Sequence, residues 1–228
     1  MGYVFIGQAH NASAAKGLTV VELFTSPGCS DTPPASEQFE KLSDLPRSNL
    51  ILISCHVTFF EEQVPDPFAR EFCDFRHDQY SNALGLSESS TPKTIINGQF
   101  DTKGDQEHIL QAAINLASSM NDVSAIQLDL GSKDLSITLP KINVKEPADI
   151  WLFAYKKRED MPVTAGPLAG KIMKNINVAT HAQKLLNWDG GYRNLNVPKD
   201  MFPADGFVII AQAPKTMKIV AAGSIEKD

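Results

Sequence analysis

The sequence predicts an α/β fold over its first half, followed by an antiparallel, β-sandwich-like region over its second half. In the first half, apolar runs of strand length at residues 18–24 and 49–57 flank a stretch with helical spacing. In the second half, residues 125–130 and 135–139 alternate apolar and polar positions with period two. Alternating α and β elements favour a parallel sheet, whereas successive short strands favour a sandwich.

These two patterns divide the chain. We expect a first domain at residues 17–122 and a β-rich second domain at residues 123–228. Residues 1–16 combine a short apolar patch with the small-residue run Ala12-Ser13-Ala14 but have no basic start. This tail is therefore either the remnant of an export signal or a disordered terminus. The first alternative predicts a periplasmic or secreted protein.

Composition excludes several classes of function. The chain of 228 residues has a formal net charge of −6 and no basic cluster, which argues against nucleic-acid binding. No apolar run approaches the ~20 residues of a membrane-spanning helix, so we expect no membrane span. Three cysteines are an odd number, so at most one internal disulfide forms and one thiol stays free.

The first strand leads into a turn and then a helix at residues 33–45. The turn is Ser26-Pro27-Gly28, in which proline fixes φ and glycine permits a positive φ. One of residues 30–32 caps the helix. Cys29 then lies at the N-terminal end of the helix, where backbone N–H groups and the helix dipole favour a thiolate.

The second strand, residues 49–57, is the most apolar run of the first half and is expected to be a central parallel strand. With the first strand and helix it makes a right-handed βαβ unit. Cys29 therefore lies beyond the C-terminal end of the first strand, where open α/β sheets place their sites.

A second helix is predicted over residues 67–84, after a loop at residues 58–67. Asp66 is its expected N-cap and Gly85 its expected end. The positions that we expect on one stripe of this helix are Phe68, Phe72, Phe75 and Ala83.

Residues 91–100 read as a strand opened by Pro92 and followed by a hairpin turn at Asn97-Gly98. We expect the Thr91–Pro92 bond to be cis, although a trans proline at a strand edge is the alternative. A helix at residues 104–120 completes a β-α-β-α-β-β-α order.

The second half contains further strands and two hairpin turns. Residues 131–134 join the two alternating runs, and residues 214–216 join a late hairpin. A strand is also expected at residues 149–155. Residues 171–187 are expected to be a long connection that pairs or packs across the sandwich.

A proline at a strand start beside a thiol at a helix N-terminus is the arrangement of thioredoxin-like proteins. The chain also resembles a bacterial secreted family with that fold, catalogued as domain of unknown function twelve twenty-three. The matching stretches are Val21-Glu22-Leu23-Phe24-Thr25-Ser26, Gly28-Cys29-Ser30, Pro33-Pro34, His56-Val57, Asp66-Pro67-Phe68-Ala69, Ala83-Leu84-Gly85, Thr91-Pro92, Asn97-Gly98, Asp149-Ile150-Trp151-Leu152 and Leu186-Asn187-Trp188-Asp189-Gly190. The resemblance implies a thioredoxin-like domain, a β-rich C-terminal region and export, but no known substrate.

The chain departs from this family at the site itself. The pattern is Cys29-Ser30-Asp31-Thr32, so a threonine stands where the second cysteine of a C-x-x-C pair is usual. Residues 58–62 and 165–171 also differ from the family's pattern. These differences put dithiol redox activity and a shared C-terminal site in doubt.

Cys29 is either a reactive thiol or an inert relic of one. Thr32 can donate its hydroxyl to the Cys29 sulfur, whereas the charge of Asp31 opposes a thiolate. A single thiol still forms mixed disulfides if another thiol resolves them. Cys55 is expected in the core, and Cys73, on the second helix, is a weak candidate for that resolving thiol.

His56 follows the central strand toward the same end of the sheet. It is either a base or charge partner for Cys29, or a half-buried histidine held by hydrogen bonds. Cys29 and His56 alone do not make a closed metal site, so we expect neither a metal nor a cofactor. Pro92 would position the backbone of an extended substrate, as the resemblance to thioredoxin-like proteins implies.

The residues therefore suggest a monothiol thiol-disulfide oxidoreductase of the cell envelope, with Cys29, Thr32, Pro92 and His56 at its site. Its expected partner is a protein, or a small thiol or disulfide. A redox-inactive binding or scaffold protein that keeps the groove beside Pro92 is the alternative.

Overall fold

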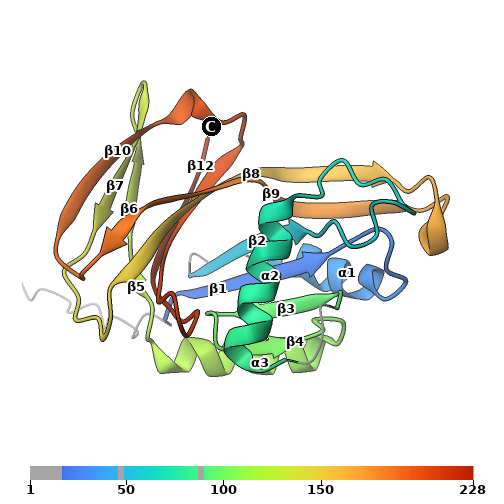
Figure 1. Ribbon diagram of the computed structural model, residues 1–228, viewed down its shortest axis with the longest axis horizontal. Coiled ribbons are helices and arrows are strands. Elements are labelled where there is room, and N and C mark those ends of the chain that lie inside the picture. Colours follow the sequence, from blue (N-terminus) through green and yellow to red (C-terminus); the bar gives the residue numbers. More distant parts are fainter. Residues whose placement is uncertain (1–16, 46–48, 87–89, 228) are drawn as a thin grey trace, which may run out of the picture.

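The computed structural model describes residues 17–45, 49–86 and 90–227 and has a mixed α/β architecture (Figure 1). The expectation for residues 1–16 lies outside this range. The helices are α1 (Thr32–Ser43), α2 (Glu71–Leu84) and α3 (Glu107–Met120), with short 3₁₀ segments η1 (Gly166–Leu168) and η2 (Lys199–Met201). The strands are β1 (Thr19–Thr25), β2 (Leu50–His56), β3 (Lys93–Ile96), β4 (Phe100–Thr102), β5 (Ser124–Ala125), β6 (Gln127–Leu130), β7 (Asp134–Leu139), β8 (Ala148–Pro162), β9 (Ile172–Trp188), β10 (Arg193–Pro198), β11 (Gly206–Gln212) and β12 (Ile219–Glu226).

A nine-stranded mixed sheet in the order β4-β3-β1-β2-β9-β8-β11-β12-β5 runs through the molecule. Strands β1 and β2 are parallel along their whole length, as the βαβ reading predicts, and β3 is antiparallel to β1. Strand β9 joins this part to the later strands, pairing with β2 at Ser54↔Val178 and with β8 along most of its length. One sheet therefore crosses the expected boundary near residue 122.

Helices cover both faces of the first part of the sheet. Residues of α1 and α3 pack on one face, in a cluster that includes Val21, Leu23, Phe39, Leu52, Ile96 and Leu110. Residues of α2 pack on the other face, with Phe24, Ile53, Cys73, Tyr80 and Ile95. Because alternate residues of a strand point to opposite faces, a strand covered on both sides reads as continuously apolar, as β1 and β2 do.

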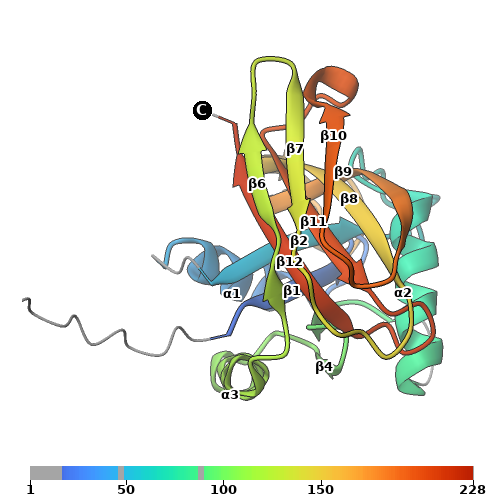
Figure 2. The ribbon, with the colours of Figure 1, turned by 90° about the vertical axis from the view of Figure 1, so that its left-hand side faces the viewer.

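The second part of the chain adds a smaller sheet, in the order β10-β7-β6 (Figure 2). Alternate residues of β7 are buried, and they pack against β8 and β11 in a second apolar cluster that includes Leu135, Ile137, Leu139, Ile150, Leu152 and Ile209. The hairpin turns predicted at residues 131–134 and 214–216 are present between β6 and β7 and between β11 and β12.

Three predictions for α2 are wrong: its start, its N-cap and the place of Phe75 on the packed stripe. The helix begins at Glu71 rather than at residue 67, and its N-cap is Arg70. Asp66 is not the cap because its carboxylate instead accepts hydrogen bonds within the preceding loop. Phe75 is 59% exposed, since the buried side of the helix carries Cys73, Arg76, His77 and Tyr80.

Two other stretches differ from the sequence expectation. Residues 171–187, expected to be a long connection that pairs or packs across the sandwich, form most of β9, a regular strand that joins the two parts of the sheet. Helix α3 begins at Glu107, three residues after the expected start. The hairpin at Asn97-Gly98 is confirmed, with φ of 49° and 68° at these residues, as a two-residue turn of this kind requires.

A disulfide joins Cys55 on β2 to Cys73 on α2, with the two Cα atoms 5.4 Å apart. Both residues are fully buried, so Cys55 lies in the core as expected. Cys73 is bonded to Cys55 and is therefore not a free thiol for Cys29, which corrects its assignment as a candidate resolving thiol. Cys29 is the free cysteine.

None of the helices in the described part of the chain is long and apolar enough to cross a membrane.

Candidate active site around Cys29

Cys29 lies in the turn between β1 and α1, where the chain bends back on itself. Its N–H donates to the Ser26 carbonyl at 3.2 Å, and its own carbonyl accepts from the N–H of Thr32 at 3.2 Å. The Gly28 N–H donates to the Ser26 hydroxyl oxygen at 3.1 Å. These bonds hold Cys29 half-buried at the start of α1, the position that the sequence predicts.

Gly28 is required because Phe60 lies directly above the turn. A Cβ atom at Gly28 would stand 2.3 Å from the Cβ atom of Phe60, which is far inside van der Waals contact. The loop after β2 therefore covers the residue that precedes the thiol.

The Cys29 thiol meets a segment 62 residues away in the sequence. Its S–H donates to the backbone carbonyl of Thr91, with 3.0 Å between sulfur and oxygen. The Thr91–Pro92 peptide bond is cis, as predicted, and Pro92 is buried at the start of β3. The structure thus brings together two of the four predicted site residues, Cys29 and Pro92, through the carbonyl of Thr91.

Thr32 is fully buried in the first turn of α1. The Thr25 hydroxyl donates to the Thr32 hydroxyl oxygen at 3.4 Å. Among the described residues, no hydrogen bond joins Thr32 to the Cys29 sulfur. The threonine hydroxyl therefore ties the helix to the end of β1, a role the sequence reading did not foresee.

His56, the last residue of β2, is fully buried rather than half-buried. Its Nδ1 atom lies 2.8 Å from a carboxylate oxygen of Asp66, and the ring meets Phe68 edge-on. The other oxygen of Asp66 accepts the N–H of Phe68 at 2.9 Å. In the described part of the chain, the Nε2 atom of His56 has no hydrogen-bond partner.

His56 is therefore bonded to Asp66 and not to Cys29. His56 is the strand partner of Thr25 in the β1–β2 pairing, and Thr25 is the residue whose hydroxyl bonds to Thr32. This arrangement matches the hydrogen-bonded alternative of the sequence analysis, and it fixes the loop that carries Phe60 and Phe68.

His77, a buried residue of α2 beside the same site, is not among the residues predicted from the sequence. Its Nε2–H donates to the Ser90 carbonyl at 3.1 Å, immediately before Thr91. Its ring lies edge-on to Phe24 and Phe59. Burial, and then the charge of Lys93, hold the pKa of His77 below its ordinary value. Its spacing of four residues from Cys73 on α2 is the signal that could have placed it on the buried face.

A long hairpin formed by β8 and β9 flanks the site on the side of α1. Its tip packs on the loop after β2, in a small apolar cluster formed by Val64, Met161, Val163, Leu168 and Met173, with Phe68 against it. A cavity of about 220 Å³ lies between this tip and α1 and is lined in part by Pro33 and Ile172. Ile172 is 68% exposed, so this side of the site offers an apolar surface.

Within the described ranges, no three His, Cys, Asp or Glu side chains are grouped so that they would hold a metal ion.

The family described as "Protein of unknown function (DUF1223)" matches residues 20–212, which include all of the site residues above. The chain belongs to this family. The match also spans most of both parts of the sheet, so family membership covers the C-terminal region and not the thiol site alone.

Two solved structures share the fold of this family member. The crystal structure of a protein from Agrobacterium tumefaciens is 21% identical, with a TM-score of 0.81, and the alignment covers 94% of this chain and 97% of that one. HBP35 of Porphyromonas gingivalis is 13% identical, with a TM-score of 0.62, and the alignment covers 92% of this chain and 75% of that one. No curated protein matches the chain.

Proposed function

We propose that this protein is a monothiol thiol-disulfide oxidoreductase with a thioredoxin-like domain. The observation that carries the proposal is the 3.0 Å contact between the Cys29 sulfur and the Thr91 carbonyl, which holds a free thiol beside the start of β3. The thioredoxin-like assignment is supported by the parallel β1–α1–β2 unit, by the antiparallel β3 and β4, and by helices on both faces.

The reaction is a thiol-disulfide exchange in two steps. The Cys29 thiolate attacks one sulfur of a substrate disulfide, forms a mixed disulfide with it, and releases the other substrate sulfur as a thiolate. A second thiol, from another molecule, then attacks the mixed disulfide and releases Cys29. This second thiol must come from outside the chain because Cys55 and Cys73 are bonded to each other.

The substrate class follows from what surrounds the thiol. An extended polypeptide or a small disulfide fits a half-buried sulfur that contacts the segment before Pro92. We propose a periplasmic or secreted location, since a structural disulfide persists in an oxidising compartment.

One observation favours a second candidate, a redox-inactive binding protein. The hydroxyl of Thr32 is engaged with Thr25, and the Cys29 thiol is engaged with a carbonyl. In this alternative the thiol is a structural hydrogen-bond donor, and a peptide binds at the surface beside Pro92 without exchange.

Trapping of a mixed disulfide separates the two candidates. The folded protein is incubated with oxidised glutathione, and the adduct is located by mass spectrometry. We expect one adduct, on Cys29, that forms at least about tenfold faster than on the same protein unfolded in denaturant. Cys29→Ser is the control and forms none. A rate in the folded state at or below the unfolded rate contradicts the oxidoreductase proposal and favours the binding protein.

Restoring the second cysteine tests the geometry. Thr32→Cys places two cysteines three residues apart at the start of α1, and we expect an intramolecular disulfide that gives insulin reductase activity in the presence of a reductant. Thr32→Ser, which keeps the hydroxyl, is the matched control and gains no activity. An oxidised Thr32→Cys protein that still carries two titratable thiols contradicts the predicted site geometry.

A further inference from the structure

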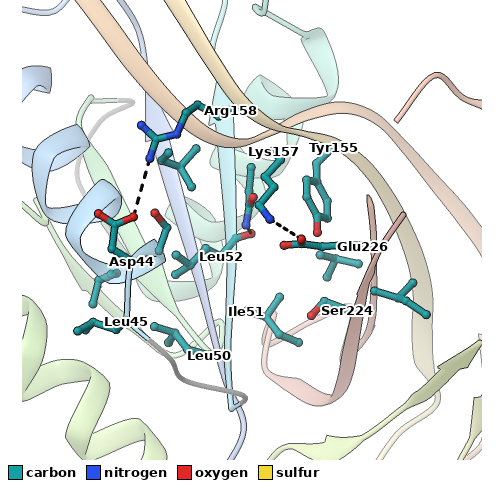
Figure 3. Close-up of a pocket in the computed structure, with 16 residues that line it drawn as sticks. Asp44, Leu45, Leu50, Ile51, Leu52, Tyr155, Lys157, Arg158, Ser224 and Glu226 are labelled. Atoms are coloured by element: carbon teal, nitrogen blue, oxygen red, sulfur yellow. Dashed lines mark hydrogen bonds and ion pairs between the residues drawn. The ribbon is translucent and has the colours of Figure 1, made fainter. Parts of the chain in front are cut away.

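A cavity of about 340 Å³ lies on the opposite side of β2 from β1, far from the strand ends that carry Cys29 (Figure 3). The end of α1 and the first residues of β2 form one wall, and β8 and β12 form the other. Its volume falls within the range of ligand-binding pockets, about 300–1,000 Å³. It lies where the two parts of the large sheet meet.

The sheet opens here because β2 and β9 are joined at one end. Ser54↔Val178 is the pairing between these strands, and the Ser54 hydroxyl donates to the Ile176 carbonyl at 2.6 Å. Asn177, with a φ of 49°, bends β9, and its side-chain amide donates to the Leu52 carbonyl at 3.1 Å. Toward the start of β2 the two strands separate, and the cavity fills the gap.

The edge of β2 that faces the cavity carries backbone groups suited to another strand. The Asn49 carbonyl and the Val57 N–H bond to β1, so the alternate residues Leu50 and Leu52 direct their backbone groups to the other side. Asn177 bonds to the Leu52 carbonyl. Among the described residues, β2 pairs with β9 at Ser54↔Val178. By the same alternation, the N–H groups of Leu50 and Leu52 and the Leu50 carbonyl face the cavity, as the edge of a sheet does.

Charged and hydroxyl side chains surround this edge. Lys157 lies 2.6 Å from Glu226 on the wall formed by β8 and β12, and Arg158 of the same wall reaches Glu40 at 2.8 Å and Asp44 at 3.9 Å on α1 and at its end. Figure 3 shows Lys157, Glu226, Arg158 and Asp44 around the opening, with Tyr155 above Glu226. Burial, and then the charges of Glu226 and Asp205, raise the pKa of Tyr155, so its hydroxyl stays neutral.

We propose that this cavity binds a short peptide as an added strand on the edge of β2. The peptide backbone bonds to Leu50 and Leu52, its carboxylate lies at Lys157 or Arg158, and its ammonium group lies at Glu226 or Asp44. Because the α1 wall carries Asp44 and the β8–β12 wall carries Lys157, Arg158 and Glu226, the cavity offers both charges and matches a zwitterionic chain better than a single anion or cation. When a peptide is added as a strand, its main-chain hydrogen bonds supply the affinity. We therefore expect little dependence on the side chains of the peptide.

Titration with trialanine, followed by the amide signals of the ¹⁵N-labelled full chain, tests the proposal. We expect saturable shifts at Leu50, Leu52 and Glu226, with a dissociation constant near about 1 mM. Trialanine N-methylated at its central residue lacks one backbone donor and should bind at least about fivefold more weakly. Peptide with both ends blocked should also bind more weakly.

Two neighbouring lysines of β8 provide a matched pair of variants. Lys157→Gln removes a charge at the cavity and should weaken trialanine binding about fivefold. Lys156→Gln removes the adjacent charge and should leave binding unchanged. Lys156 is paired with Asp205 at 3.0 Å, and neither side chain lines the cavity. The proposal is overturned by an absence of shifts up to about 10 mM trialanine, by shifts confined to other surfaces, or by equal binding of the N-methylated peptide.

Discussion

At the scale of single residues, three side chains in and near the Cys29 site make hydrogen bonds that the local sequence does not predict. Thr32 bonds to Thr25, Asp66 bonds to His56, and His77 supports the segment before Thr91. In each case the partner comes from another element, so the role depends on the tertiary structure. The thiol is therefore positioned by contacts between elements rather than by the turn alone.

His77 makes stability depend on pH. Its pKa is held below the ordinary value by burial and Lys93, so the folded protein keeps the ring neutral where the unfolded chain takes up a proton. As the pH falls below about 6.5, the unfolded state binds more protons than the folded state, and the free energy of unfolding decreases. We expect His77→Gln, which keeps an amide donor for the Ser90 carbonyl, to lose less stability than the wild type between about pH 7.5 and pH 5.

Urea unfolding at several pH values measures this difference. His108→Gln, on α3, is the control and should follow the wild type. Parallel curves for the wild type and His77→Gln would show that His77 is not responsible for the pH dependence.

At the scale of elements, α2 is bound to the sheet by buried charge as well as by the disulfide. Arg76 of α2 forms a bidentate pair with Glu22 of β1, and both are within 5% exposure. Arg76 also donates to Gln212 of β11 at 2.9 Å and to Tyr80 at 2.9 Å. Burial opposes its charge, but Glu22 and Tyr80 raise the pKa of Arg76, so the guanidinium stays charged. One helix thus connects strands from both parts of the sheet.

Removing one partner of this pair should be costly. Arg76→Met leaves the Glu22 carboxylate buried without a counter-charge, and we expect the free energy of unfolding to fall by about 3–5 kcal/mol. The double variant Glu22→Gln with Arg76→Met should lose less than the sum of the two single changes, because no lone charge remains. Chemical denaturation measures both, with the exposed Arg193→Met as a control that changes stability by less than about 0.5 kcal/mol. A similarly small loss for Arg76→Met would mean that the pair does not anchor α2.

At the scale of the whole molecule, the two parts share a core. One apolar cluster contains Val20, Phe24 and Ile53 from the first part together with Phe153, Val208 and Ile219 from the second. The nine-stranded sheet and the reach of Arg76 to Gln212 also cross between them. Neither part can bury its apolar surface without the other.

We therefore expect a single cooperative thermal transition for the full chain. Differential scanning calorimetry should give a calorimetric enthalpy equal to the van't Hoff enthalpy, the sign of two-state unfolding. A chain of residues 17–122 alone should not unfold cooperatively, because the face of β1 and β2 that meets Phe153 would be exposed. Two resolved transitions in the full chain would indicate independent domains instead.

Local signals explain which parts of the structure the sequence predicts. The cis bond before Pro92 and the Asn97-Gly98 hairpin depend on proline, asparagine and glycine, whose backbone preferences are local. The pairing of Ser54 with Val178 could not be predicted from the sequence. A single strand pairing between residues far apart in the chain leaves no periodic pattern of apolar residues. The start of α2 was misplaced because Asp66 has the chemistry of a cap but bonds to His56.

The same holds for the cysteines. Alternation along β2 put Cys55 in the core, but its bond to Cys73 depends on where α2 crosses the sheet. Sequence spacing cannot give that crossing point, since Cα atoms must approach within about 7 Å before a bridge can form.

The bridge between Cys55 and Cys73 has a practical consequence for work on this molecule. With those sulfurs sequestered, a maleimide dye or a photo-crosslinker attaches to the native chain at one known place, next to Thr91. The unaltered protein can thus be labelled at Cys29 alone, and a molecule bound next to the label can be cross-linked without engineering a cysteine.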